Sequence, residues 1–347
     1  MHWLLLALAL MLASVSASAD ELLIVCAKAK SAIEAKDLDR AIVDYGNCLE
    51  DRSLSDFERS VILYERGKVR LAKRQYNAAI DDFDAAYRQD PRFFPALSAR
   101  AMAHDQAGDY DSALADHNLT AQLFPHDPWV LLERGVTYVH KGEYVHAIAD
   151  FDIVLARQPN NATALANRGM AYYLKGDLDR AIADDDAAIR LNSGLPLPRI
   201  YRGLALVLKG ESDKGVHDLT VAIQLGADSA VAWGARCHAE AILGRLPEAI
   251  ADCDRALQLR PDDPTLLALR GDAYLRSQNY VRAIADYDAA IKLFAGRQPQ
   301  RTAESLFGRA IAHSRLGQRE LAARDFLQAL ALDTGIEAKM SRIGLVK

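Results

Sequence analysis

The sequence predicts an all-α fold built from an array of helical hairpins, and three observations support this. An Arg followed by a small residue recurs at a fixed interval, since Arg134, Arg168 and Arg202 are each 34 residues apart. Within each interval, two apolar stripes have helical spacing. A short turn such as Gly142 to Tyr144 separates the stripes and leaves room only for an antiparallel hairpin. A fixed period of this size indicates that each repeat buries its apolar face against its neighbours.

The recurring Arg sets the register of the array. We number each repeat so that the small residue after the Arg stands at position 8. In the fourth repeat, Leu131, Gly135 and Tyr138 then occupy positions 4, 8 and 11 on one helix, and Phe151 occupies position 24 on the next. Small residues at positions 8 and 20 let the two helices approach closely. The Arg stands at residues Arg66, Arg100, Arg134, Arg168, Arg202, Arg236, Arg270 and Arg309.

These landmarks resemble the tetratricopeptide repeat family over most of the chain. The resemblance implies a right-handed superhelical solenoid of about nine helix-turn-helix repeats, whose first helices line a concave groove. Departures are local: Asp185 stands where an aromatic residue is usual, and extra residues follow the first and eighth repeats. We expect a terminal cap, because end repeats need a covered face. The expected segments are repeats at 22–55, 60–93, 94–127, 128–161, 162–195, 196–229, 230–263, 264–297 and 303–336, with a C-terminal cap at 337–347.

The N-terminus predicts export. Residues 3–15 are apolar but short for a membrane span, and Ala17 to Ala19 then forms a small-x-small cleavage site. We expect a signal peptide at 1–19, cleaved after Ala19, and a periplasmic or secreted protein that is not inserted in a membrane after cleavage. The alternatives are an uncleaved N-terminal segment that anchors the protein to a membrane, and a misplaced start in a cytosolic protein.

The four cysteines are placed to form two disulfides. Cys26 and Cys48 occupy positions 5 and 27 of the first repeat, whereas Cys237 and Cys253 occupy positions 8 and 24 of the seventh. In an antiparallel hairpin, residues at equal height have a constant sum of position numbers, and both pairs give the same sum. Each pair therefore lies within bridging reach. The alternative is four small buried residues, but an exported chain with an even cysteine count favours disulfides.

The recurring Arg at position 7 needs an anionic partner, because it lies at the edge of a buried stripe. Position 23 carries Asp in every repeat, so we expect a structural ion ladder rather than an anion-binding site, since each charge is matched. The pairs at the centre of the array are Arg134 with Asp150, Arg168 with Asp184, and Arg202 with Asp218.

Composition argues against several functions. A net charge of −5 on a mixed-sign sequence disfavours nucleic acid as a partner. The consecutive Asp184, Asp185 and Asp186 point in different directions on a helix, and His104 and His117 occupy packing positions, so we expect no metal site. No phosphate loop or catalytic constellation is present. We therefore expect neither an enzyme nor a bound cofactor.

Function is expected on the exposed face of the first helices, where positions 2, 5, 9, 12 and 13 lie. In the fourth to sixth repeats these positions are largely apolar and aromatic, which favours a groove for an extended or helical segment of a partner protein. Two alternatives stay open: the groove is covered by adjacent turns of the solenoid, or it is the interface of a self-associating structural protein that forms homo-oligomers. The expected groove residues are Trp129, Leu132, Val136, Val139, Met170, Tyr173, Leu174, Ile200, Leu204, Val207 and Leu208.

Overall fold

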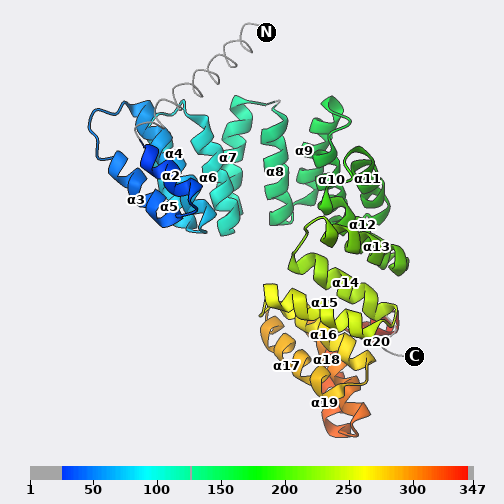
Figure 1. Cartoon of the computed structure of the whole chain (residues 1–347). Helices are drawn as coiled ribbons and strands as arrows, with labels where there is room; N and C mark the ends of the chain where they lie inside the picture. Colours follow the sequence, from blue (N-terminus) through cyan, green and yellow to red (C-terminus); the bar gives the residue numbers. More distant parts are fainter. Residues whose placement is uncertain (1–25, 126, 343–347) are drawn as a thin grey trace. The chain divides into compact units, whose positions relative to one another are not determined.

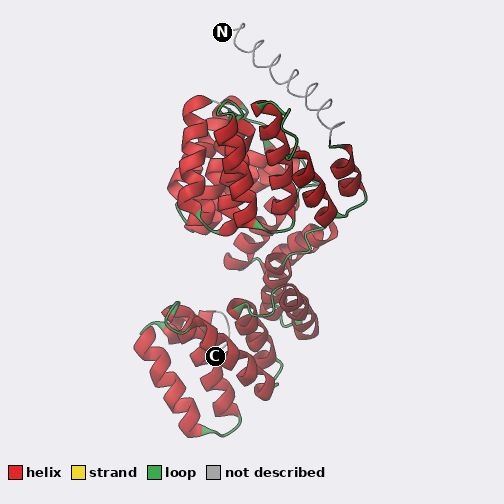
Figure 2. Ribbon diagram, turned by 90° about the vertical axis from the view of Figure 1, so that its left-hand side faces the viewer, coloured by secondary structure: helices red, strands yellow, loops and turns green. Residues whose placement is uncertain are grey.

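The computed structural model describes residues 26–125 and 127–342, and the predicted signal peptide lies outside them. The described residues form nineteen helices and no strand (Figures 1 and 2). The all-α repeat solenoid predicted from the sequence is therefore confirmed. The chain divides into an N-terminal block, residues 1–159, and a C-terminal block, residues 160–347. Each block is described by itself.

The N-terminal block contains four helical hairpins. Each first helix packs against its own second helix, and α6 also packs against the first helices on either side of it, α4 and α8. The helices are α2 (Ala27–Glu34), α3 (Leu38–Cys48), α4 (Asp56–Ala72), α5 (Tyr76–Gln89), α6 (Phe94–Ala107), α7 (Tyr110–Leu123), α8 (Pro128–Lys141) and α9 (Tyr144–Arg157).

The C-terminal block contains five hairpins and a final helix. The first helices α10, α12, α14, α16 and α18 pack side by side in that order and form one face, which we call the first-helix face. The helices are α10 (Ala162–Lys175), α11 (Leu178–Leu191), α12 (Pro196–Leu208), α13 (Ser212–Gln224), α14 (Ala230–Ile242), α15 (Leu246–Leu259), α16 (Pro264–Arg276), α17 (Tyr280–Phe294), α18 (Pro299–Arg315), α19 (Arg319–Leu332) and α20 (Ile336–Arg342).

Local sequence explains where the helices begin and end. Gly108, Gly142 and Gly176 end their helices with φ of 83°, 86° and 90°, a left-handed conformation that glycine adopts without steric cost. Asp127 and Asp263 are N-caps, since each side chain accepts a hydrogen bond from the first turn of its helix.

The extra residues after the first and eighth repeats are helical and lengthen the next first helix. Helices α4 and α18 each have 17 residues. Ser55 and Glu58 form a capping box that begins α4 early. Pro299 at the first turn of α18 does the same, because its fixed φ suits a helix start. This extension carries Arg301 onto the first-helix face.

The predicted C-terminal cap corresponds in part to α20. Its first residue, Ile336, is fully buried and joins a core cluster with Leu306, Phe307 and Ala329. The end of α18 and α19 is thereby covered with apolar side chains. Residues beyond Arg342 lie outside the described part of the chain.

Candidate partner-binding face

Eight arginines bind the aspartate sixteen residues later in the same repeat. Arg134 donates from Nε to Asp150 Oδ2 over 2.8 Å and from Nη2 to Oδ1 over 2.6 Å. This two-point geometry is the strongest that the pair can adopt. The central pairs of the ladder, including Arg168 with Asp184 and Arg202 with Asp218, have the same geometry. The other pairs are Arg66–Asp82, Arg100–Asp116, Arg236–Asp252, Arg270–Asp286 and Arg309–Asp325.

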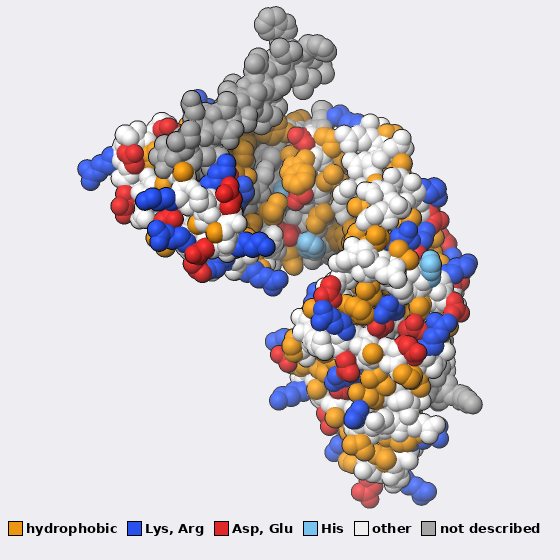
Figure 3. Space-filling view, in the orientation of Figure 1, with side chains coloured by type: hydrophobic (Ala, Val, Ile, Leu, Met, Phe, Trp, Pro, Cys, Tyr) orange, Lys and Arg blue, Asp and Glu red, His pale blue; other side chains and the backbone are white. Residues whose placement is uncertain are grey.

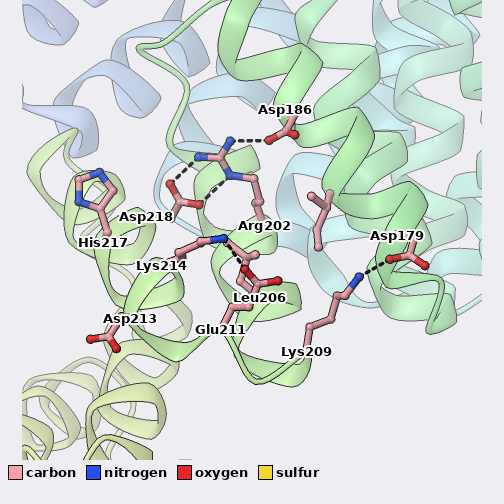
Figure 4. A pocket seen from close by; sticks show the side chains of 11 residues that line it. Asp179, Asp186, Arg202, Leu206, Lys209, Glu211, Asp213, Lys214, His217 and Asp218 are labelled. Atoms are coloured by element: carbon pink, nitrogen blue, oxygen red, sulfur yellow. Dashed lines mark hydrogen bonds and ion pairs between the residues drawn. The ribbon is translucent and has the colours of Figure 1, made fainter.

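Most of these arginines also reach back to the preceding repeat. Figure 4 shows Arg202 between Asp218 of its own repeat and Asp186 of the repeat before, to which Nη1 donates over 2.6 Å. The hydrogen bonds to Asp218, and to a smaller extent the one to Asp186, raise the pKa of Arg202. The ladder therefore joins helices within and between repeats. The backward acceptors are Asp84 for Arg100, Asn118 for Arg134, Asp186 for Arg202, Thr220 for Arg236, Asp254 for Arg270 and Asp288 for Arg309.

The hollow beside Arg202 is large, about 670 Å³, but its charges are already matched. Lys209 binds Asp179, and Lys214 binds Glu211 over 2.5 Å (Figure 4). A site whose cations all have protein partners offers little net field to attract an anion. The hollow follows from the ladder geometry rather than from a ligand.

Positions 8 and 24 form a second recurring contact inside each hairpin. A Cβ placed on Gly135 would lie 2.5 Å from the Phe151 ring, so glycine is needed at position 8 to make room for the ring. In the seventh repeat the same two positions carry Cys237 and Cys253, which are bonded across Cα atoms 5.4 Å apart. Cys26 and Cys48 are bonded in the first repeat. The structure thus joins the cysteines in the predicted pairs.

Asp185 takes the place of the ring in the fifth repeat. Its side chain is fully buried, and neither carboxylate oxygen has a hydrogen-bond partner. Burial, assisted by the charge of Asp184, raises the pKa of Asp185 to about 9, so the group is protonated at neutral pH. His117 occupies the equivalent position in the third repeat, where burial lowers its pKa to about 4 and keeps it neutral.

The predicted groove residues divide into surface and core. Trp129, Leu174 and Leu208 are exposed, with 56%, 39% and 61% of their surface accessible, and Leu132, Val136, Tyr173 and Leu204 are half-buried. The other four are buried and present little exposed surface, although one of them, Val207, still lines a hollow on the first helices. These four are Val139, Met170, Ile200 and Val207.

The following repeat explains this burial in the C-terminal block. Ile200 belongs to a core cluster with Ala232 and Ala235 of α14, and Val207 clusters with Ala239 of the same helix. Positions 5 and 12 thus point toward the next first helix. A helical wheel drawn for a single hairpin does not show that contact.

A hollow of about 400 Å³ lies on the first-helix face of the C-terminal block and is lined mainly by apolar side chains, together with His238, Arg260, Asp263 and Arg301. Tyr173, Leu204 and Leu208 line it from α10 and α12, and Val231 and Leu266 line it from α14 and α16. Figure 3 shows hydrophobic side chains on the visible surface of this block, interspersed with charged ones. We call this hollow the apolar groove.

A second hollow of about 290 Å³ adjoins the apolar groove and shares five lining residues with it: Leu208, His238, Thr265, Leu269 and Arg301. The repeat register does not predict the contribution of Arg301, Glu304 and Ser305, which line this hollow from α18. Their signal was the extra segment before the ninth repeat, which begins α18 early. Its other lining residues are Ala268, Asp272, Tyr287 and Phe294.

The N-terminal block has its own, smaller hollow of about 230 Å³ on its first helices. Trp129 lines it together with Tyr64, Met102 and Glu133. Burial raises the pKa of the Glu133 carboxyl, an effect to which the charge of Asp105 adds. Trp129 is thus an exposed aromatic side chain beside a partly apolar hollow.

The described residues contain neither a cluster of metal ligands nor a helix suited to a membrane. Within residues 26–125 and 127–342, no three His, Cys, Asp or Glu side chains are grouped so that they could hold a metal ion. In the same part of the chain, no helix combines the length and apolarity needed to cross a membrane.

Helical hairpins of constant period, stacked through small residues at fixed positions, define a helical repeat protein. The tetratricopeptide repeat model matches residues 64–128, 132–196, 202–264 and 268–336, well over half of the sequence. The chain belongs to the tetratricopeptide repeat family. No curated protein matches it.

Solved structures show the same fold at low identity. A tetratricopeptide repeat protein from Parabacteroides merdae is 18% identical with a TM-score of 0.54, covering 77% of this chain and 99% of its own. The Cut9-Hcn1 structure of the APC/C is 16% identical with a TM-score of 0.65, covering 89% of this chain and 60% of its own. A monomeric mutant of IFIT1 with Gppp-AAAA is 16% identical with a TM-score of 0.54, and the match covers 87% of this chain and 76% of the IFIT1 chain.

Proposed function

We propose that this protein is an exported scaffold that binds an extended or helical segment of a partner protein on its first helices. The observation that carries the proposal is the apolar groove of the C-terminal block. Leu208 and Val231 are 61% and 40% exposed on either side of a hollow large enough for several side chains. Exposed apolar side chains that surround a hollow favour a protein partner, because burying them releases water.

The groove suits a segment rather than a whole globular surface. It runs across parallel first helices, and its apolar side chains come from α10, α12, α14 and α16. An amphipathic helix or an extended strand places side chains at regular intervals, which matches such a series. In the N-terminal block, Trp129 and the hollow of about 230 Å³ that it lines provide a separate contact surface.

Export rests on a different observation. Both cysteine pairs are bonded, and disulfides persist mainly in oxidising compartments such as the periplasm or the exterior of the cell. This agrees with a signal peptide at residues 1–19. Sequencing the N-terminus of the mature protein tests cleavage after Ala19, and an intact N-terminus would support the membrane-anchored alternative.

The groove is tested by charge substitution. Tyr173→Glu, Leu204→Glu and Leu208→Glu should each abolish crosslinking and pull-down of the partner from the native compartment. Val281→Glu is the matched control, since Val281 is 69% exposed on α17 and does not line the groove. Helical content and melting temperature should stay unchanged in the Leu208 and control variants. Partner capture that survives all three groove substitutions would refute the proposal.

Self-association is the competing outcome. Size-exclusion chromatography with light scattering should show a monomer at working concentration. A dimer that Leu208→Glu dissociates and Val281→Glu leaves intact would instead assign the groove to a homo-oligomeric structural protein.

A further inference from the structure

The hollow that adjoins the apolar groove is lined by a half-buried carboxylate. Asp272 lies on α16, and its Oδ1 accepts a hydrogen bond of 2.6 Å from the hydroxyl of Tyr287 on α17. Tyr287 and Phe294 are each 1% exposed, so the carboxylate rests against a fully buried aromatic wall. Burial raises the pKa of Asp272 to about 6. The ionised form is thus poorly solvated, and a cation delivered by a ligand would stabilise it.

A second group in the same hollow, unlike Asp272, has no hydrogen-bond partner. Ser305, on α18, is 2% exposed, and its Oγ has no hydrogen-bond partner although the residue lines the hollow. Buried hydroxyl groups are normally paired, because an unpaired one costs about 1–3 kcal/mol. Ser305 therefore offers an acceptor to a group that enters from the groove.

The charges around the hollow leave it acidic. Arg301 donates to Glu304 Oε2 over 3.3 Å, so these two lining charges offset each other. His238 is neutral, because burial and the nearby Arg276 and Arg301 lower its pKa to about 4. Arg276 also acts on Asp272 one helical turn away, but burial outweighs it. The lining residues therefore carry a net negative charge at Asp272.

We propose that this hollow, which we call the acidic pocket, receives a lysine or arginine side chain of the partner segment bound in the apolar groove. The proposal rests on the proposed function and extends it to the chemistry of the partner. Leu208 and Leu269 line both hollows and contact the aliphatic stem of the basic side chain. The charged head binds Asp272 and donates a hydrogen bond to Ser305. The partner segment is thus apolar with one basic residue at a fixed position.

The test begins with a random dodecapeptide library displayed on phage and selected on the full-length mature protein at pH 7.5. Groove-dependent peptides are those that bind the wild type and not the Leu208→Glu variant. These peptides should share a lysine or arginine at one position relative to their apolar residues. If no groove-dependent peptide is recovered, the proposed function itself fails. If groove-dependent peptides are recovered without a common basic residue, only the acidic pocket is refuted.

The pocket is then tested by a double-mutant cycle with the best peptide. Asp272→Asn removes the charge while its amide oxygen still accepts from Tyr287, so the fold is expected to hold. Dissociation constants are measured for the selected peptide and for its norleucine analogue, against wild type and Asp272→Asn. We expect Asp272→Asn to weaken the basic peptide by a factor of about 10 or more and to leave the norleucine peptide unchanged. Equal losses for both peptides would overturn the proposal.

Two controls make the result specific. Asp262→Asn removes an exposed carboxylate outside both hollows and should leave all affinities unchanged. Lowering the pH from 7.5 to 5 should weaken the basic peptide on wild type, because Asp272 becomes protonated, and weaken it much less on Asp272→Asn. The groups that face Asp272, namely Tyr287, Arg276, Arg301 and Glu304, are present in both proteins. A wild-type affinity that does not change with pH would contradict the assignment.

Discussion

Gly169 on α10 lies directly against the carboxyl group of Asp185 on α11. A Cβ on Gly169 would stand 2.5 Å from Asp185 Oδ1, the same relationship that Gly135 has with the Phe151 ring. The fifth repeat thus keeps the space for an aromatic ring and fills it with an unpaired, protonated carboxyl group. A defect in the packing of one hairpin follows, and it can be repaired by substitution.

Asp185→Phe should raise the free energy of unfolding by about 1–3 kcal/mol. The substitution removes a buried carboxyl group that makes no hydrogen bonds. It places an aromatic ring against Gly169, as the Phe151 ring lies against Gly135 in the fourth repeat. Urea denaturation followed by circular dichroism measures the change. Phe151→Asp is the reciprocal variant and should destabilise the fourth repeat. A destabilised Asp185→Phe protein would show that the fifth hairpin has lost the space that Gly169 provides.

Asp185 should also make stability fall as pH rises. Its pKa is about 9 in the folded protein and about 4 in the unfolded chain, so the folded state holds the extra proton between these values. Stability from this group is complete below pH 4 and is lost as pH rises toward 9, with a slope of at most about 1.4 kcal/mol per pH unit.

Asp185→Asn isolates the contribution of Asp185 to the pH dependence of stability, because the asparagine side chain is neutral at every pH. Unfolding in urea at pH 5, 7 and 8.5 should show a smaller loss of stability in Asp185→Asn than in wild type. The charged neighbours Asp184, Asp186, Asp218 and Arg202 are present in both proteins. Parallel pH profiles would mean that Asp185 is ionised in the fold.

Within the ion ladder, the two contacts of Arg202 should differ in their contribution to stability. Asp218 is 2% exposed, so Arg202→Ala leaves a buried charge without its main partner and should cost about 3–5 kcal/mol. Asp186 is 41% exposed, and Asp186→Asn should cost about 1 kcal/mol or less. Thermal unfolding of both variants measures which substitution lowers the stability more, and equal losses of stability would contradict this prediction.

Reduction should destabilise both blocks. The two disulfides close loops with sequence separations of 22 and 16, and loops of this size contribute about 3 kcal/mol. Non-reducing mass spectrometry should find both bonds, and dithiothreitol should lower the melting temperature. Cys237→Gly with Cys253→Phe is a matched repair, because it installs the glycine and ring of the other repeats. Four free thiols in the mature protein would remove the support for export.

Gly46→Asp should add a missing contact between repeats. A Cβ on Gly46 would lie 3.7 Å from Arg66 Nη1, the atom that binds an acceptor of the preceding repeat elsewhere in the ladder. Gly46→Asp should raise the free energy of unfolding by up to about 1 kcal/mol more than Gly46→Ala does, because Ala improves only the helix propensity. Equal stability of the two variants would mean that Arg66 does not reach the new carboxylate.

The period of the sequence was sufficient to predict the hairpins, because every repeat keeps small residues where its helices cross. The same register brought each Arg to its Asp sixteen residues later. It did not show that Ile200 and Val207 are buried, since the contact that covers them comes from α14 in another repeat. Nor did it show the acidic pocket, because Arg301 and Ser305 depend on how early α18 begins, and that start departs from the period.

The backward reach of the arginines has a mechanical consequence. Nη1 of Arg202 binds Asp186 of the preceding hairpin, while Nε and Nη2 bind Asp218 of its own hairpin. Separating the two hairpins therefore leaves Asp186 without its arginine as well as breaking the contact of Arg202. Such a chain of shared contacts transmits load along each block and makes its hairpins yield together. A partner segment that is bound in the groove and placed under tension would therefore act on hairpins that resist unfolding as a group, rather than on hairpins that unfold one at a time.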